Sequence, residues 1–142
     1  LKDGSKKMSK SELSDLSRIN LTDDTDLIVN KIKKAKTDPL PMPNSTKDLN
    51  ERLEAKNLLG IYSSLTNSTL EKSVEIFAGK NFSEFKEKLT EVLVDRIQPV
   101  SLEIKKLLND RSYLDNTLLE GVERANKIAS KKIKRIKEIV GF

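Results

Sequence analysis

The sequence predicts an all-α protein, a compact bundle of about five helices that follows an N-terminal loop. Apolar residues recur by threes and fours along most of the chain, and no stretch of useful length alternates as a β-strand would. Glycine and proline are few and concentrate in two loops. With 36% hydrophobic and 35% charged residues among 142, the chain suits one helical domain with a modest core and well-solvated outer faces.

The first helix is expected to begin at Asp23–Asp24 and to run to about Lys36. Carboxylates are favourable at the positive N-terminal end of a helix. A proline biases the preceding residue away from helix, so Asp38 should lie outside. Three prolines make the connector Pro39–Pro43 semi-rigid. The apolar residues of this helix follow at helical spacing: Leu27, Ile28, Ile32 and Ala35.

Two shorter helices are expected next. The second runs from about Asn50 to Leu65. Ser68 and Glu71 have the spacing of a capping box, which predicts a third helix that ends near Ala78 with Gly79 after its end. The apolar stripe of the second helix consists of Ala55, Leu58, Leu59, Tyr62 and Leu65.

Asn81 and Glu84 predict the start of a fourth helix. Pro99 removes one backbone donor, so it should kink or restart this helix, and the apolar pattern then continues to Asn109. The residues expected to point inward are Phe85, Leu89, Val92, Leu93 and Ile97.

The longest helix is expected last, behind a second capping box formed by Ser112 and Asp115. Gly121 lies beside its apolar stripe, where a neighbouring helix could approach closely. The stripe consists of Leu114, Leu118, Val122, Ala125, Ala129, Ile133, Ile136 and Val140.

Cations lie on the face of this last helix that points away from the apolar stripe. With a net charge of +5, such a face suits a phosphate backbone. The alternative is a solvated surface whose cations favour the helix C-terminus. Aromatic residues are few, so any RNA contact should be to phosphates and shape rather than through base stacking. The candidate tRNA-binding residues are Arg124, Lys127, Lys131 and Lys134, with Arg135 beside them.

The most specific motif is the pentapeptide Lys7-Met8-Ser9-Lys10-Ser11, or KMSKS. Two ammonium groups three residues apart, on a loop preceded by Gly4, can neutralise charge that develops on a leaving pyrophosphate. Backbone N–H groups of the serines can hold the same anion. The alternative is a solvated lysine- and serine-rich segment that spells the motif by chance.

KMSKS and the segments after it, in this order, resemble the C-terminal part of bacterial-type tryptophanyl-tRNA synthetases of class I. The resemblance covers essentially residues 1 to 142. The segments are Ile19–Asp24, Ile32–Asp38, Glu54–Ser63, Phe77–Phe82, Phe85–Lys86, Pro99–Val100, Glu120–Ala125 and Val140–Phe142.

The resemblance implies tryptophan activation by ATP with Mg²⁺, then transfer to tRNA(Trp), in a cytoplasmic enzyme that forms a homodimer. Lys7 and Lys10 would be the catalytic cations, and Met8, Ser9 and Ser11 would complete the ATP site. Residues 1–22 would be the loop and a remnant of the catalytic domain, and residues 23–142 a helical domain that engages the anticodon arm.

The absences are also informative. Without histidine the second class I signature, His-Ile-Gly-His, cannot be present, so we expect a fragment that is inactive alone. Without histidine or cysteine no zinc site or disulfide is expected, and no metal site is assigned. No apolar run could span a membrane, and no signal peptide is visible. Two alternatives stay open: a tyrosyl-tRNA synthetase fragment, and a freestanding helical module that binds RNA or protein.

Overall fold

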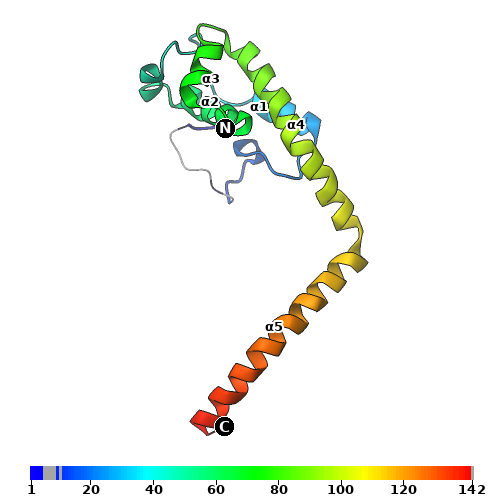
Figure 1. Cartoon of the computed structure of the whole chain (residues 1–142). Helices are drawn as coiled ribbons and strands as arrows, with labels where there is room; N and C mark the ends of the chain where they lie inside the picture. Colours follow the sequence, from blue (N-terminus) through cyan, green and yellow to red (C-terminus); the bar gives the residue numbers. More distant parts are fainter. Residues whose placement is uncertain (5–8, 10, 142) are drawn as a thin grey trace. The chain divides into compact units, whose positions relative to one another are not determined.

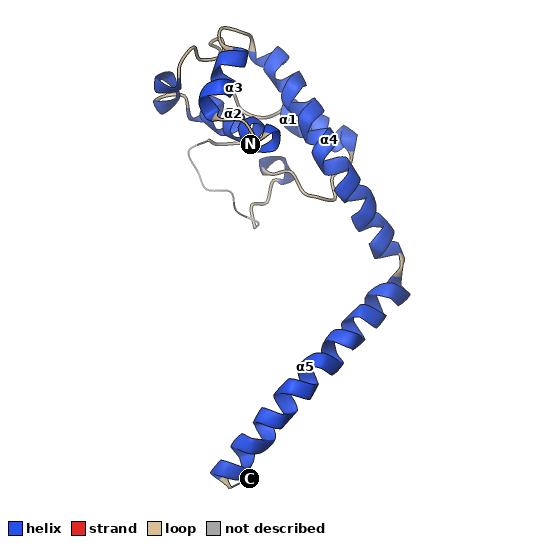
Figure 2. Ribbon diagram, in the orientation of Figure 1, coloured by secondary structure: helices blue, strands red, loops and turns tan. Residues whose placement is uncertain are grey.

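The all-α prediction is confirmed in a computed structural model that describes residues 1–4, 9 and 11–141. These residues form five α-helices, two short 3-10 helices and no strand (Figures 1 and 2). The chain divides into two units, Leu1–Leu102 and Glu103–Phe142. The elements in order are η1 (Asp15–Ser17), α1 (Thr25–Lys33), η2 (Thr46–Asn50), α2 (Leu53–Thr66), α3 (Leu70–Phe77), α4 (Phe82–Asn109) and α5 (Arg111–Val140).

The first unit has one hydrophobic core, to which α1 to α4, η2 and the proline connector all contribute. At its centre the Phe77 ring meets Tyr62 and Phe85 edge-on, with ring centroids 4.9 and 4.8 Å apart. Such aromatic pairs stabilise beyond the area that they bury. The core residues are Ile28, Ile32, Ala35, Met42, Leu49, Ala55, Leu58, Leu59, Val74, Phe77, Phe85, Leu89 and Leu93.

Helix α1 begins where the sequence predicts and ends earlier. The Asp24 carboxylate accepts a hydrogen bond from the backbone N–H of Leu27 at 2.9 Å, which caps the helix. The predicted end near Lys36 is wrong, because α1 stops at Lys33. The Lys86 ammonium donates to the carbonyls of Lys33 and Ala35 at 3.1 and 2.7 Å, and it thereby closes the helix end from α4.

Both predicted capping boxes are wrong, one by a single residue and the other by two. Thr69, not Ser68, caps α3 by accepting from the backbone N–H of Lys72. Asp110, not Ser112, caps α5 by accepting from the N–H of Tyr113 at 3.0 Å. The reason for the second shift is that α4 extends to Asn109 and leaves one residue between the two helices.

The turn between α3 and α4 follows the prediction. Gly79 has φ +70°, a left-handed conformation that favours glycine. The Asn81 side chain accepts from the N–H of Glu84 at 2.8 Å at the start of α4. The sequence predicted a kink or a restart at Pro99, and α4 continues through this residue without a restart. A proline removes a single donor, which a long helix can tolerate.

The proline connector is fixed at several points. The N–H of Met42 donates to the carbonyl of Lys80 at 2.7 Å, and that of Gly79 donates to the carbonyl of Met42 at 3.1 Å. The Arg52 guanidinium forms an ion pair with Asp38 at 2.6 Å. These contacts make the connector a rigid part of the first unit.

Helix α5 makes up most of the second unit and contains no buried residue. The predicted apolar stripe is therefore solvent-exposed, with Leu118, Val122, Ile133 and Ile136 each more than half exposed. A Cβ on Gly121 would meet no atom within 4 Å, so the close approach expected there does not occur. None of the described helices is long and apolar enough to cross a membrane.

Candidate functional site

Of the KMSKS residues, Lys7, Met8 and Lys10 lie outside the described part of the chain. Ser9 and Ser11 are described and exposed. Their hydroxyl oxygens are 2.9 Å apart, and the N–H of Ser11 donates to the Ser9 hydroxyl at 3.3 Å. Both hydroxyls therefore remain accessible to a phosphate oxygen.

Upstream of the motif, Gly4 lies directly on the start of α2. A Cβ at Gly4 would be 2.6 Å from the carbonyl oxygen of Leu53 and 2.8 Å from the backbone nitrogen of Glu54. Neither backbone atom can move aside cheaply, so only glycine fits here without a local shift. Gly4 thus packs closely against the backbone at the start of α2.

Downstream of the motif, Arg18 joins two points of the same segment. Its guanidinium donates to the carbonyl oxygen of Glu12 at 3.1 Å and forms an ion pair with Asp15 at 3.4 Å. Glu12 is in turn linked to the motif, because its N–H donates to the carbonyl of Ser9 at 3.3 Å. We call Glu12–Asn20 the post-motif segment.

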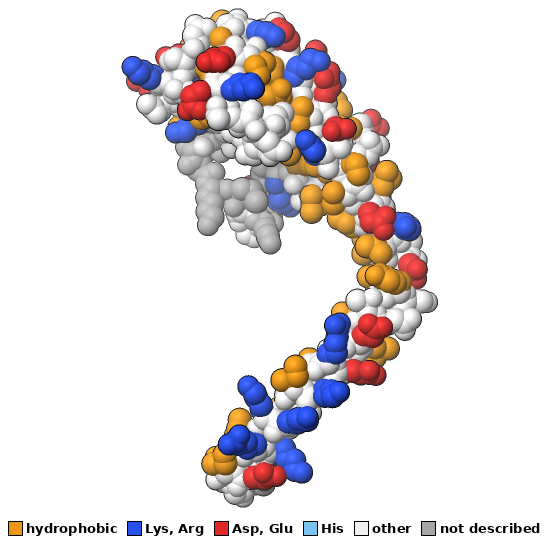
Figure 3. Space-filling view, in the orientation of Figure 1, with side chains coloured by type: hydrophobic (Ala, Val, Ile, Leu, Met, Phe, Trp, Pro, Cys, Tyr) orange, Lys and Arg blue, Asp and Glu red, His pale blue; other side chains and the backbone are white. Residues whose placement is uncertain are grey.

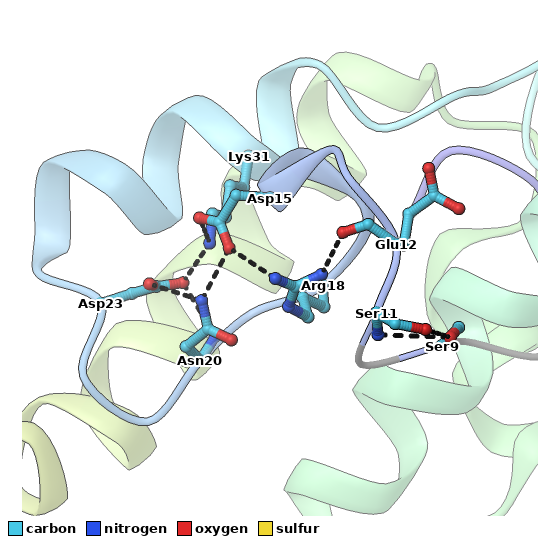
Figure 4. Close-up of polar contacts among 8 residues, drawn as sticks. All are labelled: Ser9, Ser11, Glu12, Asp15, Arg18, Asn20, Asp23 and Lys31. Atoms are coloured by element: carbon cyan, nitrogen blue, oxygen red, sulfur yellow. Dashed lines mark hydrogen bonds and ion pairs between the residues drawn. The ribbon is translucent and has the colours of Figure 1, made fainter.

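A buried lysine of α1 fixes the post-motif segment (Figure 4). The Lys31 side chain is 0% exposed, and its ammonium lies 2.6 Å from Asp15 and 2.7 Å from Asp23. Asn20 bridges the two carboxylates, donating from its amide to Asp15 at 2.9 Å and to Asp23 at 3.3 Å. The backbone N–H of Asn20 also donates to Asp23 at 2.9 Å. We call Asp15, Asn20, Asp23 and Lys31 the anchor cluster.

The contacts within the anchor cluster favour the charged forms of Lys31 and Asp15. Burial by itself would lower the pKa of the Lys31 ammonium, but hydrogen bonds to Asp15 and Asp23 outweigh it and raise that pKa. Hydrogen bonds from Lys31 and Asn20 hold the pKa of the Asp15 carboxyl below its ordinary value. The pair is therefore ionised at neutral pH.

The sequence predicted that Asp23 and Asp24 are both charges at a helix terminus, and the structure confirms this role for Asp24 only. Asp24 caps α1 as expected, whereas Asp23 is 4% exposed and pairs with Lys31. Lys31 was not identified from the sequence as a buried residue. Lys31 lies three residues after Ile28 and directly before Ile32, so it falls on the apolar side of the helix. A lysine at such a position signals a buried partner. No group of three or more potential metal ligands occurs among the described residues.

The candidate tRNA-binding residues all lie on α5. Arg124, Lys127, Lys131 and Lys134 are exposed, and Lys and Arg side chains recur along this helix in Figure 3. The Arg124 Nε donates to the carbonyl of Glu120 at 3.3 Å, which leaves the rest of its guanidinium open to solvent. We call these four side chains the basic face.

The KMSKS motif points to class I aminoacyl-tRNA synthetases, and in this chain described residues on both sides of the motif contact the helical first unit. The family model described as tRNA synthetases class I (W and Y) matches residues 1–98. The chain belongs to this family.

Curated relatives point to one branch of the family. The chain is 49% identical over 142 residues to the tryptophan–tRNA ligase of Agrobacterium fabrum and 46% identical to that of Mesorhizobium japonicum. It is 47% identical to the tryptophan–tRNA ligase of Rickettsia felis. Each match covers 100% of this chain but only 40 to 42% of the relative, so the chain spans about two fifths of these proteins.

Proposed function

We propose that this chain is the C-terminal part of a tryptophan–tRNA ligase, and that it supplies the KMSKS loop and the helical tRNA-binding domain. The observation that carries the proposal is the match of the entire chain to tryptophan–tRNA ligases at 44–49% identity, with KMSKS at its start. The whole protein would activate tryptophan with ATP and then transfer the tryptophanyl group to tRNA(Trp).

In this proposal Lys7 and Lys10 act in the first step. The tryptophan carboxylate forms a bond to the α-phosphorus of ATP, and the bond to the leaving pyrophosphate breaks. Negative charge grows on that pyrophosphate, and two loop ammonium groups stabilise it most strongly in the transition state. Met8, Ser9 and Ser11 would complete the loop's contacts with ATP, for which the exposed serine hydroxyls are chemically suited.

The remaining assignments of the whole protein belong to the same proposal. Mg²⁺ would arrive on the ATP phosphates, to which it supplies charge neutralisation. The basic face would contact tRNA phosphates rather than bases. The whole protein would form a homodimer and act in the cytoplasm.

Two other functions make different predictions. A tyrosyl-tRNA synthetase fragment is disfavoured because the matched relatives that we describe are tryptophan–tRNA ligases. A freestanding RNA- or protein-binding module would have its gene start directly before Leu1. The sequence of the whole gene separates the freestanding module from the two synthetases. The amino acid that the whole protein activates separates the two synthetases from each other.

The decisive experiment is tryptophan-dependent exchange of pyrophosphate into ATP by the whole protein. Lys7→Ala or Lys10→Ala should slow exchange by about 10²-fold or more, because each removes a preorganised contact to developing charge. The Michaelis constant for tryptophan should change little. Lys47→Ala, which removes an exposed lysine of η2, is the matched control and should leave the rate unchanged.

Two results would contradict the proposal. The first is exchange that depends on tyrosine instead of tryptophan. The second is measurable tryptophan-dependent exchange by the 142-residue chain alone, because this chain contains no histidine for the second class I signature.

A further inference from the structure

We propose that Lys31 is a positioning residue for the KMSKS loop, because it fixes the post-motif segment to α1 through Asp15. It would act on amino-acid activation through Lys7 and Lys10 and would not touch ATP. This inference rests on the proposed function of the whole protein.

The first argument is the unusual position of the Lys31 charge. Its side chain is 0% exposed and lies in the stripe that places Ile28 and Ile32 in the core. Removing an ammonium from water costs several kcal/mol in general, and apolar replacements of buried ion pairs are often as stable. Stability therefore gives little reason for a lysine here, whereas directional contacts to two carboxylates do.

The second argument is that the two carboxylates come from different places. Asp23 directly precedes Asp24, the cap of α1, so its pair with Lys31 is local to the start of that helix. Asp15 belongs to η1 within the post-motif segment, and its side chain is 48% exposed. Lys31 thus makes one ion pair near the start of its own helix and one with the post-motif segment.

The third argument is a continuous chain of contacts toward the motif. Lys31 holds Asp15 at 2.6 Å, Asp15 pairs with Arg18 at 3.4 Å, and Arg18 donates to the Glu12 carbonyl at 3.1 Å. The N–H of Glu12 donates to the Ser9 carbonyl at 3.3 Å. Figure 4 draws the contacts that lead from Lys31 through Asp15 and Arg18 to Glu12.

The test uses the whole protein with Asp15→Asn as its main variant. This change removes the charge that faces Lys31 from the post-motif segment and leaves the Lys31–Asp23 pair in place, so the fold should persist. Asp15→Glu keeps the carboxylate and serves as the conservative rescue. Lys31→Met is a harsher second variant, because it leaves Asp23 buried without its cation.

The matched control is Asp38→Asn. It makes the same chemical change at a partly buried ion pair of the same unit, where Asp38 meets Arg52 at 2.6 Å. Asp38 contacts no residue of the post-motif segment in the hydrogen bonds and ion pairs of the described residues. Asp38→Asn therefore reports the effect of losing a partly buried ion pair while the anchor cluster stays intact.

Two readouts are needed. Tryptophan-dependent pyrophosphate exchange gives kcat and the Michaelis constants, and amide hydrogen exchange reports protection across residues 12–20. We expect Asp15→Asn to lower kcat about tenfold or more, because small misplacements of a catalytic group are costly. The Michaelis constant for tryptophan should stay within about twofold and protection of residues 12–20 should fall. Asp15→Glu should recover most of the rate, and Asp38→Asn should match wild type in both readouts.

The outcomes separate this proposal from the proposed function. A wild-type kcat in Asp15→Asn overturns the positioning role, as does an equal loss in Asp38→Asn. Unchanged protection of residues 12–20 overturns the anchor itself. Absence of exchange activity in the wild-type whole protein overturns the proposed function, and any loss of protection in Asp15→Asn would then mark the anchor cluster as purely structural.

Discussion

The two units of this chain use the same hydrophobic period in different ways. In Leu1–Leu102, apolar residues at helical spacing form a closed core with the Tyr62, Phe77 and Phe85 rings at its centre. In Glu103–Phe142, α5 carries an equally regular stripe and buries none of it. The period of a helix identifies its apolar face, but it does not say what covers that face.

Charge follows the same division. In the first unit, lysines and arginines are engaged by carboxylates, as in the pairs Lys31–Asp23, Arg52–Asp38 and Lys36–Glu54. Within the part of the chain that the structure describes, the basic face of α5 makes no ion pair. Carboxylates thus hold several cations of the first unit in place, whereas the cations of the basic face are exposed to solvent.

The largest expected effect compares Phe85 with Ile136 in the 142-residue chain. Phe85→Ala should cost about 3–5 kcal/mol of unfolding free energy, because the ring is fully buried between two others. Ile136→Ala, at a side chain that is 58% exposed, should change it by about 0.5 kcal/mol or less. Urea denaturation followed by circular dichroism measures both. A comparable loss at Ile136 would mean that the stripe is buried in solution.

How far the sequence predicts the fold depends on how local each interaction is. Asp24, Asn81 and Gly79 were predicted correctly, because a cap or turn depends on a few neighbouring residues. Ser68 and Ser112 were wrong, because Thr69 and Asp110, one and two residues away, are also favourable capping residues and cap α3 and α5 instead. The choice between such neighbours depends on where the preceding helix ends.

The sequence predicts which residues of the candidate site carry its chemistry, but it does not predict the contacts that hold the flanks of the motif in place. The KMSKS lysines are evident from five consecutive letters, and their roles stay a prediction. The contact of Asp15 with Lys31 could not be read from the sequence, because it joins residues of separate elements. The same holds for Gly4, whose need for a missing Cβ arises from the backbone at Leu53.

The second prediction sharpens the contrast in charge. If the basic face contacts tRNA phosphates, Lys127→Glu combined with Lys131→Glu in the whole protein should weaken tRNA binding and leave tryptophan activation intact. The slope of log affinity against log salt should flatten by roughly 0.7 to 0.9 for each lost contact. Binding measured across a salt series checks this.

The control for that experiment makes the same change of net charge in the first unit. Lys47→Glu with Lys72→Glu reverses two exposed lysines there. Equal losses in the two double variants would indicate a general charge effect. Curves for the α5 variant that superimpose on wild type would assign the basic face to solvent.

The smallest changes in stability are expected at two glycines, Gly121 in an open environment and Gly4 against a neighbouring backbone. Gly121→Ala should stabilise α5 by about 0.5–1 kcal/mol, because alanine is the better helix former and its Cβ meets no atom within 4 Å. Gly4→Ala should destabilise the first unit by about 1–3 kcal/mol, because its Cβ would lie 2.6 Å from a backbone oxygen. Helicity against temperature, compared with the unhindered Gly60→Ala in α2, measures both changes. If Gly121→Ala destabilises the chain, a surface must press on α5 at that point, and the contrast between a packed first unit and an open second unit fails there.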